Sequence, residues 1–346
     1  MVSIVLVTYN RAARLRLSIQ DILNQTFKDF ELIICDDCST DSTEDVCREF
    51  EKRDRRIKYF RHLKNMQMPA NCNFGIQKAN SDYVAILHDG DRFKPDLIEQ
   101  WHQAISNNES VGFVFNSIGE IDEHNQVFTS YQDFDEGVVE RDQLLKRTYF
   151  RQWRFSSPVY GQAMVRKSLL TQRGFLHADF GFYADVDLWM DLLHDHDAYY
   201  CADTLIVCPT KKIQPRLFED NRISYFLLMF NMQFKHRKKA FRHNALRLSY
   251  EMIILWVQSF FSLSYWLLCV IKNQSFRSYL SVSRLLRNNP MFFTQWTIGL
   301  IFYPVLYPLL KVFTLAKGWL AQVRPVFKKK RGPAYSRDWL SRWSAK

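Results

Sequence analysis

Two carboxylates follow an apolar run in the stretch "ILHDGDRF" (residues 86–93), where only Gly90 separates Asp89 from Asp91. Like charges this close repel each other unless a positive charge lies between them or water screens both. Asp is also a common turn residue, because its short side chain can bond to the nearby backbone. The pair therefore indicates either a site with a cationic partner or a solvated turn.

Two further polar clusters end apolar runs earlier in the chain. Thr8, Tyr9 and Asn10 close the run that begins at Val2, and Asp36-Asp37 closes the run "FELIIC". In open α/β sheets, ligands bind beyond the carboxyl ends of the strands. If the strands that carry these clusters are neighbours, the three clusters line one crevice, and we expect a binding site there.

Strand and helix patterns alternate through the first half of the chain. Apolar runs rich in Val and Ile indicate buried strands, and Asp41 with Glu44 resembles a capping box at a helix start. Alternating elements of this kind predict an α/β domain with a mainly parallel sheet flanked by helices. The predicted strands are residues 2–10, 30–37, 57–61 and 82–87, and the predicted helices are residues 11–25, 41–52, 69–79 and 95–105.

The net charge of +11 is unevenly distributed along the 346 residues. Residues 1–215 hold 25 Lys and Arg against 32 Asp and Glu, a balance of −7, whereas residues 216–346 hold 22 against 4, a balance of +18. We therefore predict two domains, 1–215 and 216–346. The basic end suits nucleic acid or an anionic membrane surface as its partner.

The cysteines and the start of the sequence bear on the compartment. Seven cysteines, an odd number without framework spacing, favour a reducing compartment. "MVSIVLVTYN" lacks a basic segment and a cleavage site, so we expect no secretory signal and a cytoplasmic protein. Cys35 and Cys38 form a C-x-x-C, but both intervening residues are Asp, which would raise a thiol pKa. We expect these cysteines to be buried rather than redox-active.

The first 91 residues resemble the inverting glycosyltransferases of family 2, which have the GT-A nucleotide-diphospho-sugar transferase fold. The resemblance rests on "SIVLVTYN", on "LNQTFKDFELII" and on the following "DDCSTD". It continues more loosely to about residue 210, and the last third lies outside the usual catalytic domain. The resemblance implies an enzyme that transfers a sugar from a nucleotide diphosphate donor, with UDP-sugars favoured.

The resemblance also implies roles for the first two polar clusters. Thr8, Tyr9 and Asn10 would line the base and ribose of the donor. Asp36 and Asp37 would belong to the same nucleotide site, with Asp37 accepting a hydrogen bond from N3–H of uracil. A buried carboxylate needs such a donor, and a pyrimidine imide supplies one.

In the family, a D-x-D motif after the fourth strand holds Mn²⁺ or Mg²⁺ against the donor diphosphate. By resemblance, Asp89 and Asp91 would be the metal ligands, and Asp89 would also belong to the donor site. The register differs from the family's D-A-D-D pattern. His88 takes the first position, Gly90 takes the third position, which often supplies the metal ligand, and Asp91 takes the last. Either Asp89 and Asp91 share the metal, or the metal site is weakened.

Inversion also requires a base that takes the proton of the acceptor hydroxyl. "GFYADVDLWMDLL" (residues 181–193) resembles the family segment that carries it, and Asp185 matches the acid usually assigned as the base. Ala184 replaces the usual Glu, and a helix N-cap is the alternative role of Asp185. Residues 158–170 are interpreted as a strand followed by the start of a helix, and they match the acceptor-side segment of the family. "HDHDAYY" (residues 194–200) is interpreted as a helix-to-strand loop rather than a metal cluster.

The basic C-terminal region contains two uncharged stretches of twenty residues, 252–271 and 291–310. Basic flanks with Trp and Tyr nearby favour an anionic membrane interface, or a short hairpin with both ends cytoplasmic. We therefore predict a C-terminal helical, membrane-associated region at the inner face of the membrane. A helical subdomain that packs on the catalytic core or on a second subunit is the alternative.

These observations favour a metal-dependent inverting glycosyltransferase of polysaccharide or glycolipid biosynthesis, with a nucleotide-sugar donor and a glycan or lipid-linked acceptor. A non-catalytic nucleotide-sugar or glycan-binding protein is the alternative, motivated by Gly90 in the metal motif. Nucleic-acid binding is disfavoured, because the basic runs flank long apolar stretches rather than a recognisable nucleic-acid module.

Overall fold

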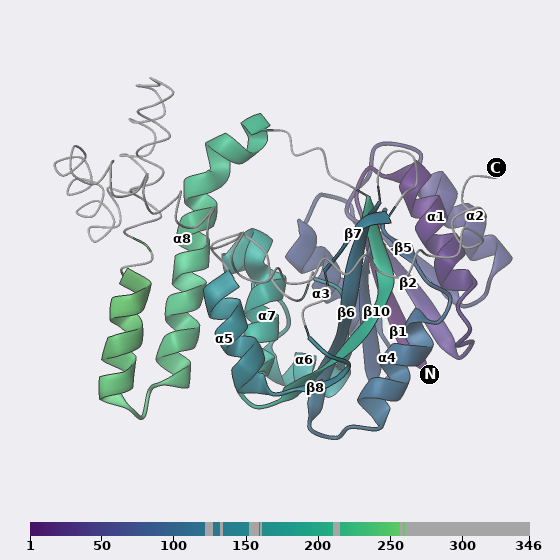
Figure 1. Ribbon diagram of the computed structural model, residues 1–346. Coiled ribbons are helices and arrows are strands. Elements are labelled where there is room, and N and C mark those ends of the chain that lie inside the picture. The colour runs from purple at the N-terminus through teal and green to yellow at the C-terminus, as the bar shows by residue number, and fades with distance from the viewer. Residues whose placement is uncertain are drawn as a thin grey trace. The chain divides into compact units, whose positions relative to one another are not determined.

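The computed structural model describes residues 1–121, 127–131, 134–151, 159, 161–209, 215–256 and 259 (Figure 1). The chain divides into two compact units at residues 211–212. The first unit is an α/β domain, and the second is helical in its described part. This division lies close to residue 215, where the charge balance changes sign.

The first unit is built on one sheet, in the strand order β3-β2-β1-β4-β9-β6-β10-β5, with β7 beside β6 and β8 beside β10. The strands are β1 (Val2–Thr8), β2 (Phe30–Asp36), β3 (Ile57–Arg61), β4 (Tyr83–His88), β5 (Arg92–Phe93), β6 (Val111–Ile121), β7 (Val127–Tyr131), β8 (Gly137–Val139), β9 (Ala163–Arg166) and β10 (Asp197–Pro209). The helices are α1 (Ala12–Leu23), α2 (Thr43–Arg53), α3 (Met68–Lys78), α4 (Leu97–Ser106), α5 (Arg141–Arg151), α6 (Lys167–Arg173) and α7 (Ala184–Leu192), with a 3₁₀ helix at Ala178–Tyr183.

The sheet is mixed, whereas the sequence predicted a mainly parallel one. β3, β2, β1 and β4 are parallel, as expected from their alternation with helices. β9 then runs antiparallel to both β4 and β6, and β5, β7 and β8 add further antiparallel pairs. The prediction was wrong for the second half of the sheet because its strands pair over long sequence distances and do not alternate with helices.

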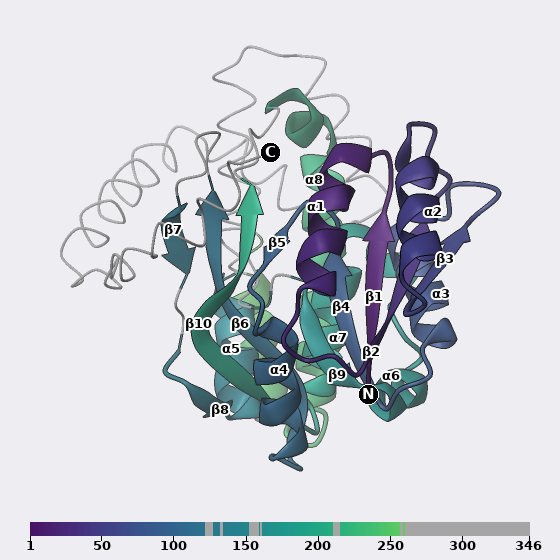
Figure 2. The ribbon, with the colours of Figure 1, turned by 90° about the vertical axis from the view of Figure 1, so that its right-hand side faces the viewer.

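Helices cover both faces of the sheet, with α1, α2 and α4 on one face and α3 and α7 on the other (Figures 1 and 2). Side chains of β1 point alternately to the two faces. Val2, Ile4 and Leu6 join the core beneath α1, α2 and α4, while Val5 faces α3. Because both faces are covered, every residue of β1 and β2 is buried, which explains the continuous apolar runs in the sequence.

The capping box predicted at Asp41 and Glu44 is not formed. Ser42 occupies the N-cap position of α2 and its side chain makes no capping hydrogen bond. Asp41 Oδ1 instead accepts hydrogen bonds from the backbone N–H and the hydroxyl of Thr43, at 3.1 and 2.5 Å. Glu44 pairs with Arg48 and Arg61, each at 3.4 Å. Asp41 and Glu44 therefore form hydrogen bonds and ion pairs that the local sequence pattern does not indicate.

The second unit contains α8 (Pro215–Ala240) and a helix over residues 245–256, joined by a short turn. Arg237 Nε of α8 lies 3.4 Å from Glu251 Oε2 of the second helix, so the two helices pack as a hairpin. Arg247, one turn before Glu251 on the same helix, lies 2.8 Å from that carboxylate. Among the described helices, none has the length and apolar character needed to cross a bilayer. The uncharged stretch 291–310 and most of 252–271 lie outside the described residues.

Candidate active site

The polar clusters at three strand ends lie at one edge of the sheet. β1 lies between β2 and β4, with Thr8 opposite Asp36 and Val7 opposite His88 in the parallel registers. The condition set by the sequence, that the three strands be neighbours, is therefore met. Parallel strands bring their carboxyl ends to the same edge, so residues 8–10, 36–37 and 88–91 form one candidate site.

Asp89 is bound to the end of β1. The Thr8 hydroxyl donates a hydrogen bond of 2.7 Å to Asp89 Oδ2, and Arg11 Nε lies 3.8 Å from Asp89 Oδ1. Burial raises the pKa of the Asp89 carboxyl, and the bond from Thr8 and the charge of Arg11 oppose this effect. A cation close to this carboxyl would favour its ionised form.

The loop after β1 is joined to the loop after β2. The Asn10 backbone N–H donates to Ser39 Oγ at 2.9 Å, and Asn10 Oδ1 accepts from the Thr40 N–H at 2.7 Å. Asn10 has a positive φ of 53°, a conformation that Asn tolerates better than most residues. Tyr9 is exposed beside this junction. The first-strand loop is thus held in place while one aromatic side chain faces outward.

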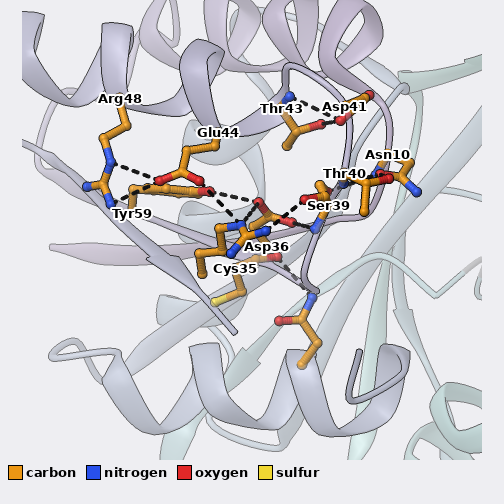
Figure 3. A network of polar contacts seen from close by, with 12 residues as sticks. Asn10, Cys35, Asp36, Ser39, Thr40, Asp41, Thr43, Glu44, Arg48 and Tyr59 are labelled. Atoms are coloured by element: carbon orange, nitrogen blue, oxygen red, sulfur yellow. Dashed lines mark hydrogen bonds and ion pairs between the residues drawn. The ribbon is translucent and has the colours of Figure 1, made fainter. Parts of the chain in front are cut away.

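Asp36 lies at the centre of a buried polar network (Figure 3). Its Oδ1 accepts from the Ser39 N–H at 2.8 Å, and its Oδ2 accepts from the Tyr59 hydroxyl at 2.7 Å. Arg61 Nε lies 3.9 Å from the same Oδ2. Both oxygens of Asp36 are engaged inside the protein, so the residue fixes the start of the loop at residues 37–41.

Asp37 faces a different neighbour. Its Oδ1 accepts a hydrogen bond of 2.6 Å from the backbone N–H of Met66, and its backbone N–H bonds to the Thr8 carbonyl. The side chains of Met66 and Leu63, in the loop between β3 and α3, are exposed. Asp37 therefore joins the ends of β1 and β2 to a loop that carries apolar side chains on its outer side.

The loop of Asp89, Gly90 and Asp91 is fixed from two further elements. Ser18 of α1 accepts a hydrogen bond from the Gly90 N–H at 3.1 Å and donates to the Asp91 carbonyl at 2.8 Å. Gln162 Nε2 donates to Asp91 Oδ2 at 2.8 Å, and Gln162 Oε1 accepts from the His88 N–H at 3.1 Å. Gly90 has a φ of +83°, which few other residues adopt without strain. The two acids thus occupy a defined turn and not a solvated one.

Asp185 lies in the first turn of α7, close to the end of β4. A Cβ atom built on Gly161 would lie 2.7 Å from Asp185 Oδ2 and 2.8 Å from His88 Cε1. Both side chains therefore lie close to Gly161, in space that a larger residue would occupy. Gly161 also has a φ of +75°. Asp185 is not the N-cap of α7, because Tyr183 takes that position.

The carboxyl of Asp185 has the properties of a proton acceptor. Its Oδ1 is enclosed and finds no hydrogen-bond donor among the described residues, although the side chain as a whole is only half-buried. Burial raises the pKa of Asp185 to about 6, and hydrogen bonds from its own and the Val186 backbone N–H oppose the rise. A carboxylate with this pKa is ionised at neutral pH and accepts a proton more readily than a solvated one.

Gly161, Gln162 and Ser18 were not identified from the sequence. Gln162 directly precedes the apolar run of β9, and a polar residue in that place is the only local signal. Cys35 is buried, and burial raises the pKa of its thiol, as expected for a packed cysteine. Residues 193–196 form the turn between α7 and β10, whereas residues 197–200, which the predicted loop also included, are the first residues of β10.

The chain was compared with known families and curated proteins. Residues 3–174 match the family model described as "Glycosyl transferase family 2". The GalNAc(5)-diNAcBac-PP-undecaprenol beta-1,3-glucosyltransferase of Campylobacter jejuni is 30% identical over 198 residues, which cover 57% of this chain and 61% of that protein. Glycosyltransferase GlyG of Streptococcus pneumoniae is 27% identical over 164 residues, 46% of this chain and 54% of that protein. The chain thus spans less than two thirds of the length of these relatives.

Solved structures share the fold at low sequence identity. Residues 1–349 of TarS from S. aureus in complex with UDP superpose with a TM-score of 0.56 and 13% identity, over 88% of this chain and 91% of that one. The mannosyltransferase PcManGT of Pyrobaculum calidifontis, in complex with GDP-Man and Mn²⁺, gives 0.51 and 14%, over 86% and 84%. This likeness shows a GT-A-like α/β fold. The match to the family model places residues 3–174 in glycosyl transferase family 2.

Proposed function

We propose that this protein transfers a sugar from a nucleotide diphosphate donor, with UDP-sugars favoured, to an acceptor hydroxyl with inversion. The observation that carries the proposal is that the side chains of Asp185 and His88 both lie close to Gly161, beside the acids that follow β4. This arrangement supports a base that lies next to a donor site at one edge of the sheet. The UDP and UDP-GlcNAc complexes of TarS support this choice of donor class.

In this proposal the nucleotide lies along the ends of β1 and β2. Tyr9 and Asn10 line the base and ribose with Thr8, and Asp37 accepts from the base, because a second donor can bond to the carboxylate that already binds the Met66 N–H. Asp36 acts through the loop that it fixes, since both of its oxygens are engaged.

Asp89 and Asp91 would hold Mn²⁺ or Mg²⁺. Both are carboxylates, the ligand type that hard divalent cations prefer, and the raised pKa of Asp89 reflects a buried carboxyl that a cation would stabilise as the anion. The residues present therefore fit such an ion. When bound, it would neutralise charge on the leaving nucleoside diphosphate.

Asp185 would act as the general base. Its carboxylate accepts the proton of the acceptor hydroxyl as the hydroxyl oxygen attacks the anomeric carbon, and the bond to the nucleoside diphosphate breaks on the opposite side. Gly161 leaves room at this point, because any side chain there would meet Asp185 and His88.

A lipid-linked acceptor is part of the proposal, because the Campylobacter jejuni relative is named for a polyprenyl-linked glycan. The outer face of the helix at 245–256 supports contact with an anionic membrane. Exposed apolar side chains follow one another on this face at helical spacing, opposite the side that packs through Glu251, and exposed basic residues flank them. The apolar residues are Leu246, Tyr250, Ile253 and Trp256, and the basic ones are Lys238, Arg242 and Arg247.

Membrane contact predicts a specific binding result. The double substitution Leu246→Glu and Ile253→Glu should weaken binding to phosphatidylglycerol vesicles at least about tenfold, because each apolar side chain contributes roughly 1.5–3 kcal/mol on burial. Leu63→Glu, which changes an exposed leucine of the first unit, is the matched control and should bind normally. Unchanged binding of the double variant would exclude this face. The corresponding location is cytoplasmic, at the inner face of the membrane.

Donor hydrolysis or transfer, measured with UDP-sugars in the presence and absence of Mn²⁺, tests the enzymatic proposal. Mn²⁺-dependent release of UDP from the wild type, and its loss in Asp185→Asn, is the expected result. Binding of UDP-sugars without release under any condition would instead support a non-catalytic nucleotide-sugar or glycan-binding protein, the alternative that Gly90 in the metal motif favours.

A further inference from the structure

Gln162 lies at the entry to β9 with its side chain buried between two parts of the β4 exit. One end of its amide accepts from the backbone N–H of His88 at 3.1 Å, and the other end donates to Asp91 Oδ2 at 2.8 Å. A single side chain therefore holds the first and the last residue of the segment from His88 to Asp91. Its two partners are separated by Asp89 and Gly90.

The contact with Asp91 differs from the other contacts that hold this segment. Within this segment, Ser18 bonds to backbone atoms of Gly90 and Asp91, and Thr8 bonds to the side chain of Asp89. Gln162 bonds directly to the Asp91 carboxylate. An amide N–H donor fixes the rotation of a carboxylate without adding a charge, so the carboxylate can still bind a cation.

The glycine between the acids makes this support necessary. Gly90 has no side chain and a φ of +83°, so it contributes no ligand and permits a wide range of backbone conformations. The orientation of Asp91 relative to Asp89 must then be set from outside the turn. Gln162 contacts both the backbone at the start of the turn and the side chain at its end.

We propose that Gln162 is a positioning residue for divalent-cation and diphosphate binding: it orients the Asp91 carboxylate so that Asp89 and Asp91 bind one ion together. This role rests on the proposed function. Residues that hydrogen-bond to metal ligands typically change metal affinity about 10–100-fold when they are replaced. The effect should therefore appear in the dependence of nucleotide binding on the metal, not in nucleotide binding alone.

Gln25 provides a matched control. It is a fully buried glutamine whose amide also bridges two segments, donating to the Lys94 carbonyl at 2.7 Å and accepting from the Ile98 N–H at 3.0 Å. Its partners are backbone atoms only and include no candidate metal ligand. Gln25→Met and Gln162→Met remove the same chemical groups from the core, so both should lower thermal stability. Only the second should alter metal-linked binding.

The experiment measures UDP affinity calorimetrically with saturating Mn²⁺ and with EDTA, using the full-length wild type, Gln162→Met and Gln25→Met. We expect the ratio of the two affinities to fall about tenfold in Gln162→Met and to stay within about twofold of wild type in Gln25→Met. The Mn²⁺ concentration for half-maximal turnover should rise by a similar factor. Gln162→Asn, too short to reach both partners, should give the same result and serves if the methionine variant does not fold.

Each outcome decides the inference. A wild-type affinity ratio in Gln162→Met or Gln162→Asn, or an equal loss of UDP affinity with and without Mn²⁺, would overturn the positioning role and leave the proposed function intact. Wild-type UDP binding that does not depend on Mn²⁺ would overturn the proposed metal site, and the role of Gln162 with it. Absence of any UDP binding by the wild type would overturn the proposed donor site.

Discussion

Replacing Asp185 with Asn should abolish sugar transfer and at the same time stabilise the fold at neutral pH. The two effects share one cause. Burial raises the pKa of the carboxyl from 3.8 to about 6, so the folded protein at pH 7 carries an ionised group that its surroundings disfavour. Asn retains the size and removes the charge.

The size of the stability effect follows from the pKa. One pKa unit corresponds to about 1.4 kcal/mol, so a rise from 3.8 to about 6 corresponds to about 3 kcal/mol at most. Solvent contact of the half-buried side chain reduces this to roughly 1–2 kcal/mol. Because the pKa of Asp185 is raised in the folded protein, the protonated carboxyl contributes its full share of stability below pH 4, and this contribution is lost as the pH rises through 6. The advantage of Asp185→Asn should therefore be absent at pH 4 and complete above pH 7.

Thermal unfolding of both proteins between pH 4 and pH 8 tests this reasoning. We expect the midpoint of the variant to exceed that of the wild type by a few degrees at pH 7.5 and the two to converge at low pH, since a kcal/mol corresponds to roughly 2–4 °C in a domain of about 200 residues. Asp179→Asn, which changes an exposed acid shortly before α7, is the control and should show no pH-dependent difference.

Activity gives the second half of the test. The base must be ionised, so wild-type turnover should fall about tenfold per pH unit below pH 6, and Asp185→Asn should lose about 10²–10⁴-fold at pH 7.5. UDP binding should persist, because Asp185 is separate from the nucleotide residues at the ends of β1 and β2. A variant that is less stable than wild type at pH 7.5, or that turns over normally, would refute the assignment of Asp185 as a buried base.

Three further predictions concern the support of the site and the fold. Gly161→Ala should reduce sugar transfer at least about tenfold, because the added methyl group would lie 2.7 Å from Asp185 Oδ2 and the backbone has a φ of +75°. Retained activity would show that the space beside Asp185 and His88 is not needed for transfer. Tyr59→Phe should lower the free energy of unfolding by roughly 1.5–3 kcal/mol in denaturant titrations, because it removes the hydroxyl donor from the buried Asp36 carboxylate, and a neutral effect would contradict the network. Burial raises the pKa of Glu31, but hydrogen bonds from Lys58, Ser3 and Asn80 lower it to about 2. Glu31→Gln should therefore lower the free energy of unfolding by up to about 3 kcal/mol at pH 7, and this loss of stability should shrink as the pH falls from 4.5 towards 2. A loss of stability that does not depend on pH would exclude the lowered pKa as its cause.

The sequence predicted the half of the fold in which local pattern and tertiary structure agree. The runs at residues 2–10, 30–37 and 82–87 are buried strands because helices cover both faces of the sheet, and the helices between them follow the expected ranges closely. Of the strands after residue 110, the sequence predicted the one within residues 158–170, where the structure has β9, and not the others. β10 pairs with β6, β5 and β8, which lie far from it in sequence, and no local periodicity reports such pairing.

The candidate site shows the same limit at the level of single residues. The acids themselves were identified because they end apolar runs or match the family motif. Gln162 was missed because its partner Asp91 lies 71 residues away in the sequence, and Gly161 was missed because its importance depends on the approach of His88 and Asp185. The structural use of Asp36 likewise depends on Tyr59, 23 residues further along the chain.

The acids at this edge of the sheet acquire different roles through their surroundings. Asp36 has both carboxylate oxygens hydrogen-bonded inside the protein and organises a loop. Asp91 accepts a directional bond from a neutral amide, which orients this proposed metal ligand without adding a charge. Asp185 is enclosed, with an oxygen that lacks a donor among the described residues, and so is the acid best suited to take a proton. A carboxylate that must move a proton cannot also be saturated with hydrogen bonds, because each bond to the anion lowers its basicity. The distribution of donors among these acids, more than their positions in sequence motifs, therefore supports the proposed division into a scaffold residue, a metal ligand and a base.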